Sequence, residues 1–202
     1  MRSWPLIAKR LIDLFGAILG MMLLSPLFLM IYILLKMDSP GPALYRRILI
    51  GFRGRPFVVY KFRSMVVDAH QMLQNNAALL QEYQRSLKIT NDSRVTRVGR
   101  FLRKTSLDEL PQLFNIIRGD MSLVGPRMLG DLELARYGDA RNILLSVKPG
   151  LTGLWQVSGR HTIAFDKRME LDLYYVEHWD LLMDINILLK TVPAVLNGTG
   201  AE

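Results

Sequence analysis

The hydrophobic pattern of the chain is most pronounced near its start, where no charged residue occurs from Leu14 to Leu35. As one straight helix this run would extend about 33 Å, enough to cross the ~30 Å hydrocarbon core of a bilayer. Pro26 removes a backbone hydrogen bond and collides with the carbonyl of Met22, so it predicts a kink that leaves each half too short to cross. Two structures remain open: a kinked spanning helix, and a helix-break-helix with its break at Ser25-Pro26.

Charged residues border this run at both ends. The flanking cations are Arg2, Lys9 and Arg10 before it, and Lys36, Arg46 and Arg47 after it. Because cytoplasmic loops carry the excess of Lys and Arg, this symmetry favours both ends on the cytoplasmic side. A signal peptide is not favoured, since the run exceeds a normal h-region and no A-x-A-like cleavage site follows. Asp13 shares a helical face with Arg10 and is expected to pair with it at the membrane surface.

Two segments after the run alternate between apolar and polar residues. Ala43–Ile50 and Pro56–Arg63 flank a turn that contains two glycines, and together they predict a β-hairpin. A period of two places Lys61 and Arg63 on the same face of the second strand. Two cations so arranged are suited to hold a phosphate group, although solvated lysines and arginines are common on any surface.

Helical patterns cover much of the remaining chain. Asp68–Lys88 is polar and helix-prone, and it is expected to form a mobile helix or loop over the site. Arg94–Lys104 predicts a basic amphipathic helix suited to anionic lipid headgroups. Asp180–Leu196 predicts a hydrophobic helix, with Asp180 as its N-cap and Asn197-Gly198 as its stop.

The stretch from Thr105 to Asn115 combines a helical pattern with two adjacent acids. Its apolar residues are expected to face the core and its polar residues to face outward. The first set is Leu107, Leu110, Phe114 and Ile117, and the second is Asp108, Gln112 and Asn115. The start also matches a capping box, with Ser106 as N-cap and Glu109 bonded back to its amide. The pattern alone therefore leaves helix capping and catalysis open.

Composition narrows the classes of function. With 26 Lys+Arg against 18 Asp+Glu among 202 residues, the net charge of +8 indicates an anionic partner: lipid headgroups, nucleic acid or a phosphorylated substrate. The absence of cysteine excludes disulfides, thiolate metal sites and a cysteine nucleophile. Neither a P-loop nor a GxGxxG motif occurs where a nucleotide-binding fold needs it. The length is that of one globular domain with an appendage.

Six features follow one another in a fixed order. They are the Pro-broken hydrophobic run, Ser39-Pro40-Gly41-Pro42, Tyr60-Lys61-Phe62-Arg63-Ser64-Met65, the Asp108-Glu109 stretch, and two Gly/Pro-containing loops that end at Arg127 and Arg160. From about Lys9 to the C-terminus this succession resembles the small monotopic phosphoglycosyl transferases, a family of bacterial sugar transferases. The resemblance implies an α+β fold with a re-entrant membrane helix-break-helix over residues 1–38. Residues 39–202 would form a compact, mainly helical cytosolic catalytic domain on the membrane surface, with a small β-hairpin and interfacial amphipathic helices.

The resemblance also implies an activity. Members of the family move a sugar 1-phosphate from a UDP-sugar to polyprenyl (undecaprenyl) phosphate and release UMP, which initiates membrane-linked glycan assembly. By resemblance, Asp108 is the nucleophile that carries the phosphosugar, and Glu109 binds Mg²⁺. A carboxylate at a helix start stays ionised near neutral pH, which suits a nucleophile.

The resemblance assigns further roles. The residues implied to bind substrate phosphate are Lys61, Arg103, Arg127 and Arg160. Asp172 is implied as a second metal or substrate contact, with a salt-bridged structural acid as the equal alternative. The expected partners are the UDP-sugar, polyprenyl phosphate and the bilayer at the cytoplasmic face of the bacterial inner membrane, without nucleic acid, and a homodimer stays open.

Because the sequence departs from the family pattern at two places, it does not reveal which sugar is transferred. Met128 follows Arg127 where the family commonly has proline, and Arg46–Gly51 replaces a usual Gln-x-Arg-x-Gly. Two other classes of protein remain as alternatives: a membrane-associated basic scaffold, and a nucleic-acid-binding module. The second would need basic residues interleaved with exposed aromatics or a reader motif, and neither is evident.

Overall fold

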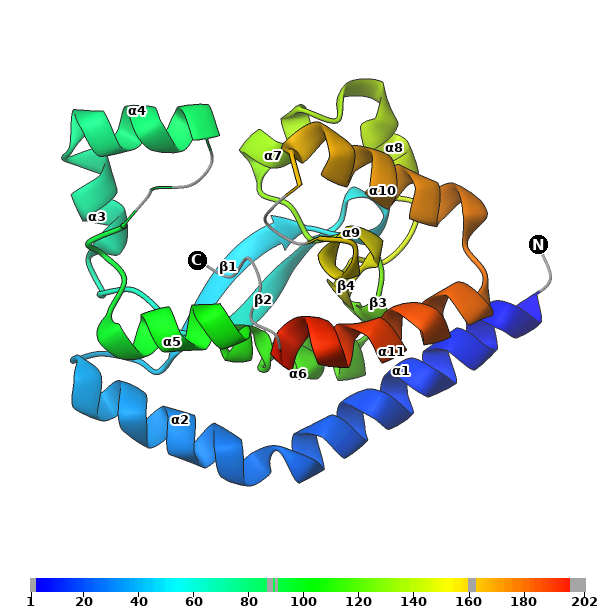
Figure 1. Ribbon diagram of the computed structural model, residues 1–202, viewed down its shortest axis with the longest axis horizontal. Coiled ribbons are helices and arrows are strands. Elements are labelled where there is room, and N and C mark those ends of the chain that lie inside the picture. The colour runs from blue at the N-terminus through cyan, green and yellow to red at the C-terminus, as the bar shows by residue number, and fades with distance from the viewer. Residues whose placement is uncertain (1–2, 87–88, 90, 160–162, 197–202) are drawn as a thin grey trace.

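The computed structural model describes residues 3–86, 89, 91–159 and 163–196 (Figure 1). Its α-helices are α1 (Ser3–Leu23), α2 (Ser25–Asp38), α3 (Ala69–Gln74), α4 (Ala77–Ser86), α5 (Arg97–Thr105), α6 (Gln112–Arg118), α7 (Asp131–Ala135), α8 (Arg141–Leu144), α9 (Leu154–Val157), α10 (Phe165–His178) and α11 (Leu181–Leu196). Its 3₁₀ turns are η1 (Phe52–Gly54), η2 (Leu107–Glu109) and η3 (Gly138–Ala140), and its strands are β1 (Leu44–Ile50), β2 (Pro56–Phe62), β3 (Ser122–Val124) and β4 (Gly150–Thr152). The fold is mostly helical with small sheets, which confirms the α+β class.

Helices α1 and α2 form a V along the lower edge of the molecule in Figure 1, bent by 60°. The break falls at Leu24, and Ser25 Oγ donates to the carbonyl of Met22 at 2.8 Å. Pro26 lies in the first turn of α2, where its missing N–H costs no helical bond. The expected break is confirmed. Within the described residues no single helix is long and apolar enough to cross a membrane, although the bent pair meets that test jointly.

The predicted β-hairpin is confirmed. β1 and β2 pair antiparallel over their whole length, from Leu44 opposite Phe62 to Ile50 opposite Pro56. In this register Lys61 lies opposite Tyr45. The turn passes through η1 and closes with a bond from the amide of Gly51 to the carbonyl of Arg55, at 2.9 Å.

Arg63 does not join Lys61, so the expected pair of cations is wrong. Arg63 is 5% exposed, and its guanidinium donates to the carbonyls of Leu35, Ser39 and Pro40. The last carbonyls of a helix have no partner within the helix. Arg63 therefore caps the end of α2 and fixes where the chain leaves the V.

The two predicted polar and basic segments are helical. Residues 69–86 form α3 and α4, which stand apart from the rest of the domain at the upper left of Figure 1. Whether they cover the site stays a prediction. Helix α5 packs against α2, and the side chain of Thr96 caps it by accepting from the amide of Gly99 at 3.0 Å.

Helix α6 lies between α1 and the hairpin, which overturns its predicted polar face. Gln112 and Asn115 are fully buried, whereas Phe114 is 44% exposed. The side chain of Asn115 accepts from the amide of Tyr60 at 3.2 Å and donates to the carbonyl of Val58 at 2.6 Å. These bonds to β2 replace water, so the amide can be buried at little cost.

The predicted pairing of Arg10 with Asp13 is also wrong. Asp13 is 4% exposed and accepts from Ser122 Oγ at 3.0 Å and from the amide of Leu123 at 2.8 Å. Arg10 instead donates to two carbonyls in the last turn of α6, at 2.6 and 2.9 Å. Both residues thus bind the domain, because each finds unpaired backbone or hydroxyl groups there.

Strands β3 and β4 form a short parallel pair that the sequence did not predict. A Cβ placed on Gly150 would lie 2.1 Å from the nitrogen of Gly125, so the two backbones meet without side chains between them. Helix α11 begins as predicted, since the amide of Met183 donates to Asp180 Oδ1 at 2.6 Å. Its predicted stop, Asn197-Gly198, lies outside the described residues.

Candidate active site

The two adjacent acids follow a residue with left-handed backbone angles. Helix α5 ends at Thr105, and Ser106 has φ 58° and ψ 15°, after which Leu107–Glu109 make a single 3₁₀ turn that leads into α6. In the described chain the side chain of Ser106 makes no cap bond, and Glu109 binds cations instead. The capping box is therefore wrong for this stretch.

Glu109 is held by two cations from other parts of the fold. Lys61 Nζ of β2 donates to Glu109 Oε1 at 2.8 Å, and Arg127 Nη2, from the loop after β3, donates to the same oxygen at 3.0 Å. Burial favours the protonated form, but the charges of Arg127 and Lys61 outweigh it and hold the pKa of Glu109 well below its usual range. Glu109 therefore stays ionised at any physiological pH.

Asp108 has a different environment from its neighbour. Burial and, after it, the negative charge of Glu109 raise the pKa of Asp108 to about 6. The positive charges of Lys61, Arg103 and Arg127 act in the opposite direction. Among the described residues no ion pair or hydrogen bond holds the Asp108 carboxylate. One acid of the pair is thus fixed by cations, and the other is ionised near pH 7 and available.

Arg103 approaches the acids from α5. Its Nε donates to Ser64 Oγ at 2.8 Å, and its charge acts on Asp108. Four elements therefore deliver charged groups to one place: β2, α5, η2 and the loop after β3. Three of the residues predicted to bind phosphate, Lys61, Arg103 and Arg127, are therefore brought together at the acids.

The buried ring of Trp155 lies beside the guanidinium groups of Arg127 and Arg168. The guanidinium carbon of Arg127 lies 5.9 Å from the centre of the Trp155 ring, and that of Arg168 lies 4.9 Å from it. Trp155 is 3% exposed. Such contacts orient a guanidinium over the ring face. Sequence reasoning missed Arg168, because its contact with Trp155 depends on how α10 packs against α9.

Two further residues were predicted, Asp172 and Arg160. Asp172 lies next to the loop of the cluster, because its carboxylate accepts a hydrogen bond from the backbone of Arg127. Asp172 is 1% exposed, and Tyr137 Oη donates to its Oδ2 at 3.1 Å. Burial raises the pKa of Asp172 to about 7, although the hydrogen bond from Tyr137 opposes the shift. Its role as a metal or substrate contact stays a prediction. Arg160 lies outside the described residues.

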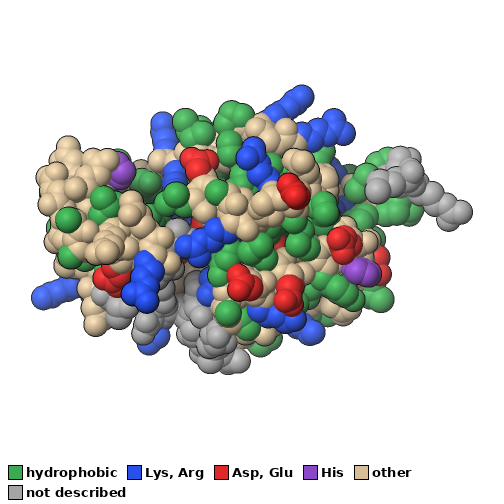
Figure 2. Space-filling view, turned by 90° about the horizontal axis from the view of Figure 1, so that it is seen from above, with side chains coloured by type: hydrophobic (Ala, Val, Ile, Leu, Met, Phe, Trp, Pro, Cys, Tyr) green, Lys and Arg blue, Asp and Glu red, His purple; other side chains and the backbone are tan. Residues whose placement is uncertain are grey.

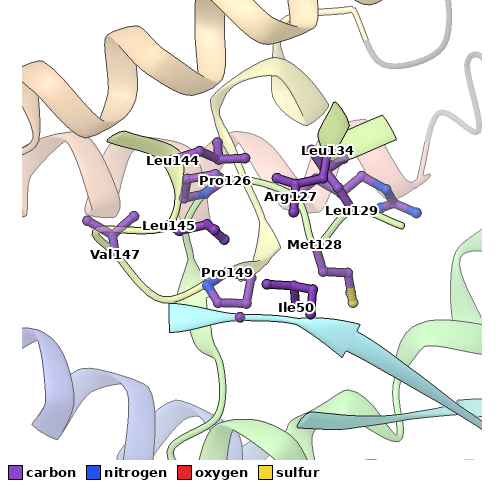
Figure 3. A pocket seen from close by; sticks show the side chains of 11 residues that line it. Ile50, Pro126, Arg127, Met128, Leu129, Leu134, Leu144, Leu145, Val147 and Pro149 are labelled. Carbon is purple, nitrogen blue, oxygen red and sulfur yellow. The ribbon is translucent and has the colours of Figure 1, made fainter. Parts of the chain in front are cut away.

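A small pocket beside Arg127 is mainly apolar (Figure 3). Ile50 reaches it from β1, and Met128 and Leu129 come from the loop that carries Arg127. None of its described lining residues is an acid. The pocket is therefore part of the apolar packing around the loop and not the place of the acids. Met128 itself belongs to a buried apolar cluster.

The acids fit a magnesium ion only with help from a substrate. In the part of the chain that the structure describes, no three His, Cys, Asp or Glu side chains gather as a metal site. Mg²⁺, however, is commonly bound by one or two carboxylates together with substrate phosphates and waters. Both ion pairs of Glu109 end on Oε1, so its other oxygen is left for a metal. Glu109 thus suits a metal site that substrate phosphates and waters complete.

Comparison with known proteins decides the family. A family model described as bacterial sugar transferase matches residues 4–198. The chain belongs to this family. A similar sugar transferase is the undecaprenyl-phosphate galactose phosphotransferase of Salmonella typhimurium, 46% identical over 96% of this chain and 41% of the relative. The exopolysaccharide production protein ExoY of Sinorhizobium fredii is 45% identical over 96% of this chain and 88% of the relative.

A third relative has a more detailed name. The UDP-glucose:undecaprenyl-phosphate glucose-1-phosphate transferase of Klebsiella pneumoniae is 40% identical over 93% of this chain and 40% of the relative. The present chain thus spans about two fifths of the Salmonella and Klebsiella proteins and most of the rhizobial one. The resemblance inferred from the order of motifs is confirmed.

Proposed function

We propose that the chain transfers a sugar 1-phosphate from a UDP-sugar to polyprenyl phosphate, releasing UMP, as an early step of membrane-linked glycan assembly. The observation that carries this proposal is the contrast within the acid pair. Glu109 is bound by Lys61 and Arg127, whereas Asp108 beside it is available. A buried, ionised carboxylate among cations is suited to attack a phosphorus atom. The names of the Salmonella and Klebsiella relatives support the same donor and acceptor classes.

In the first half-reaction, a carboxylate oxygen of Asp108 attacks the phosphorus that carries the sugar. The new P–O bond forms as the bond from that phosphorus to the bridging oxygen breaks, and UMP leaves with the bridging oxygen and its electron pair. Lys61, Arg103 and Arg127 offset the negative charge of the diphosphate and of the departing UMP. The product is an acyl-phosphate that links Asp108 to the sugar phosphate.

In the second half-reaction, a phosphate oxygen of the polyprenyl acceptor attacks the same phosphorus. The acyl-phosphate P–O bond breaks, which returns the Asp108 carboxylate and yields a sugar diphosphate lipid. No proton has to be removed from either nucleophile, since both are already anions near pH 7. The pKa of about 6 at Asp108 therefore suits a carboxylate that must be ionised and must also leave again.

Mg²⁺ fits beside these residues, with Glu109 as its protein ligand. When bound, it would neutralise diphosphate oxygens as charge moves to the leaving UMP. Glu109 stays ionised because of Arg127 and Lys61, which keeps one carboxylate ready for the metal at all working pH values.

We also propose that α1 and α2 enter the bilayer as a re-entrant hairpin from the cytoplasmic side. Large apolar side chains on both helices are exposed, among them Trp4 at 70%, Phe15 at 71% and Leu29 at 62%. The face turned away from the V carries Lys, Arg, Asp and Glu among smaller apolar areas (Figure 2). A lipid-soluble acceptor and a water-soluble donor would then reach the site from opposite sides.

The covalent intermediate gives the decisive experiment. Purified protein in detergent is mixed with a panel of UDP-sugars without acceptor, and about one UMP per active site should be released from the right donor. Mass spectrometry should find a phosphosugar on the Asp108 peptide, and Asp108→Asn should abolish both. Asp139→Asn, an exposed acid on η3, is the matched control. UMP release that requires the acceptor, or normal turnover by Asp108→Asn, would overturn the proposal.

A further inference from the structure

Helix α1 holds two separate parts of the candidate active site through neighbouring side chains. Arg10 donates to two carbonyls in the last turn of α6, the helix that follows Asp108-Glu109. Lys9 and Asp13, one turn apart on α1, bind β3, the strand that leads to Arg127. One face of the first helix therefore fixes both the element with the acids and the element with their guanidinium partner.

Lys9 is the centre of a buried polar cluster. Its Nζ donates to the carbonyl of Val124 at 2.9 Å and to Asp184 Oδ2 at 2.5 Å. Tyr175 Oη donates to Asp184 Oδ1 at 2.7 Å and lies 3.2 Å from the same Val124 carbonyl. Trp179 Nε1 adds a third donor to Asp184, at 3.1 Å. The side chains of Lys9 and Asp184 are only 17% and 5% exposed, so water screens the pair weakly.

The backbone between Val124 and Arg127 has little freedom to move. The amide of Gly125 donates to the carbonyl of Thr152 at 3.0 Å, and the amide of Gly150 donates to the carbonyl of Pro126 at 2.8 Å. A Cβ on Gly125 would lie 2.6 Å from a backbone oxygen, which shows how closely the strands approach. A displacement of the Val124 carbonyl must therefore be passed on to Arg127 rather than absorbed.

We propose that Lys9, together with Arg10 and Asp13, positions Arg127 relative to Asp108 and Glu109. The first helix of the membrane hairpin is then part of the framework of the active site as well as an anchor. This inference rests on the proposed function for its kinetic consequence, although its structural consequence does not. Lys9 contributes by holding β3 and touches no reacting atom.

A double-mutant cycle tests the proposal. Lys9→Met should lower kcat/KM for the UDP-sugar about tenfold, and Lys9→Arg should lose less than about threefold. In an Arg127→Lys background, Lys9→Met should cost less than about threefold, because two residues that act through one contact are not additive. Lys190→Met, an exposed lysine on α11, is the matched control and should change neither value. Flotation with phospholipid vesicles should be equal for all variants. An undiminished tenfold loss in the Arg127→Lys background would overturn the proposal.

Hydrogen–deuterium exchange supplies a readout that needs no turnover. Lys9→Met should speed amide exchange about tenfold in residues 122–127 and leave residues 56–62 of the hairpin unchanged. If the wild-type protein releases no UMP, the proposed function fails, and exchange still decides the positioning role. Unchanged exchange in 122–127 would overturn it, since β3 would then be held without Lys9.

Discussion

Replacing Asp108, the proposed nucleophile, should stabilise the fold, and the gain should depend on pH. The folded protein raises the pKa of Asp108 from its ordinary value of 3.8 to about 6, so the fold favours the protonated carboxyl. The resulting stability is fully present below pH 3.8 and is lost as pH rises through about 6. At 1.36 kcal/mol per pKa unit, the loss amounts to about 3 kcal/mol above pH 7, and to about half of that at pH 5.

Asp108→Asn cannot ionise and escapes this loss. Its melting temperature in detergent at pH 8, without substrate, should exceed that of the wild type by about 6–12 °C, since 1 kcal/mol corresponds to about 2–4 °C at this chain length. At pH 5 the difference should fall to about half. Asp139→Asn, which alters an exposed acid, should show no such trend. An equal difference at both pH values, or none at pH 8, would refute the reasoning that burial and Glu109 destabilise the Asp108 carboxylate.

Three further predictions concern chemistry and topology. Formation of the phosphosugar adduct should decline as pH falls through about 6, because a protonated Asp108 cannot attack; a flat profile between pH 5 and 8 would argue against it as nucleophile. EDTA should stop turnover and added Mg²⁺ restore it, whereas Glu109→Gln should stay inactive with Mg²⁺ although folded; activity in excess chelator would remove the metal. Cysteines introduced at Ser3 and Ser39 should both be labelled from the cytoplasmic side, and labelling from opposite sides would exclude the re-entrant hairpin.

Local patterns in the sequence predicted the elements of the fold well. The break next to Ser25-Pro26, the hairpin around Gly51–Arg55 and the cap at Asp180 each depend on residues close together in the chain. Proline chemistry, strand alternation and N-capping act over a few residues, so a single sequence reveals them. The three-residue strands β3 and β4 were missed, since so short a run has no readable period.

Long-range polar contacts could not be predicted. Asn115 reads as a surface residue by type, yet it is buried because β2 presents a free amide and a free carbonyl to it. Arg63 and Asp13 follow the same logic, since each satisfies backbone groups from a distant segment. In the candidate site, a sequence motif predicted the two acids, whereas the position of Arg168 beside Trp155 depends on how α10 packs.

The left-handed Ser106 decides in which part of a helix Asp108, the proposed nucleophile, lies. Had α5 continued through this position into η2 and α6, Asp108 would lie in the interior of one long helix, away from the positive partial charge of a helix start. A single residue at φ 58° stops α5 and begins a new helical segment, so the acids lie at an amino-terminal end instead. The conformation costs about 1–2 kcal/mol for a residue other than glycine. The chain thereby obtains the positive end of a helical segment at Asp108, which offsets part of the cost that burial and Glu109 place on its negative charge.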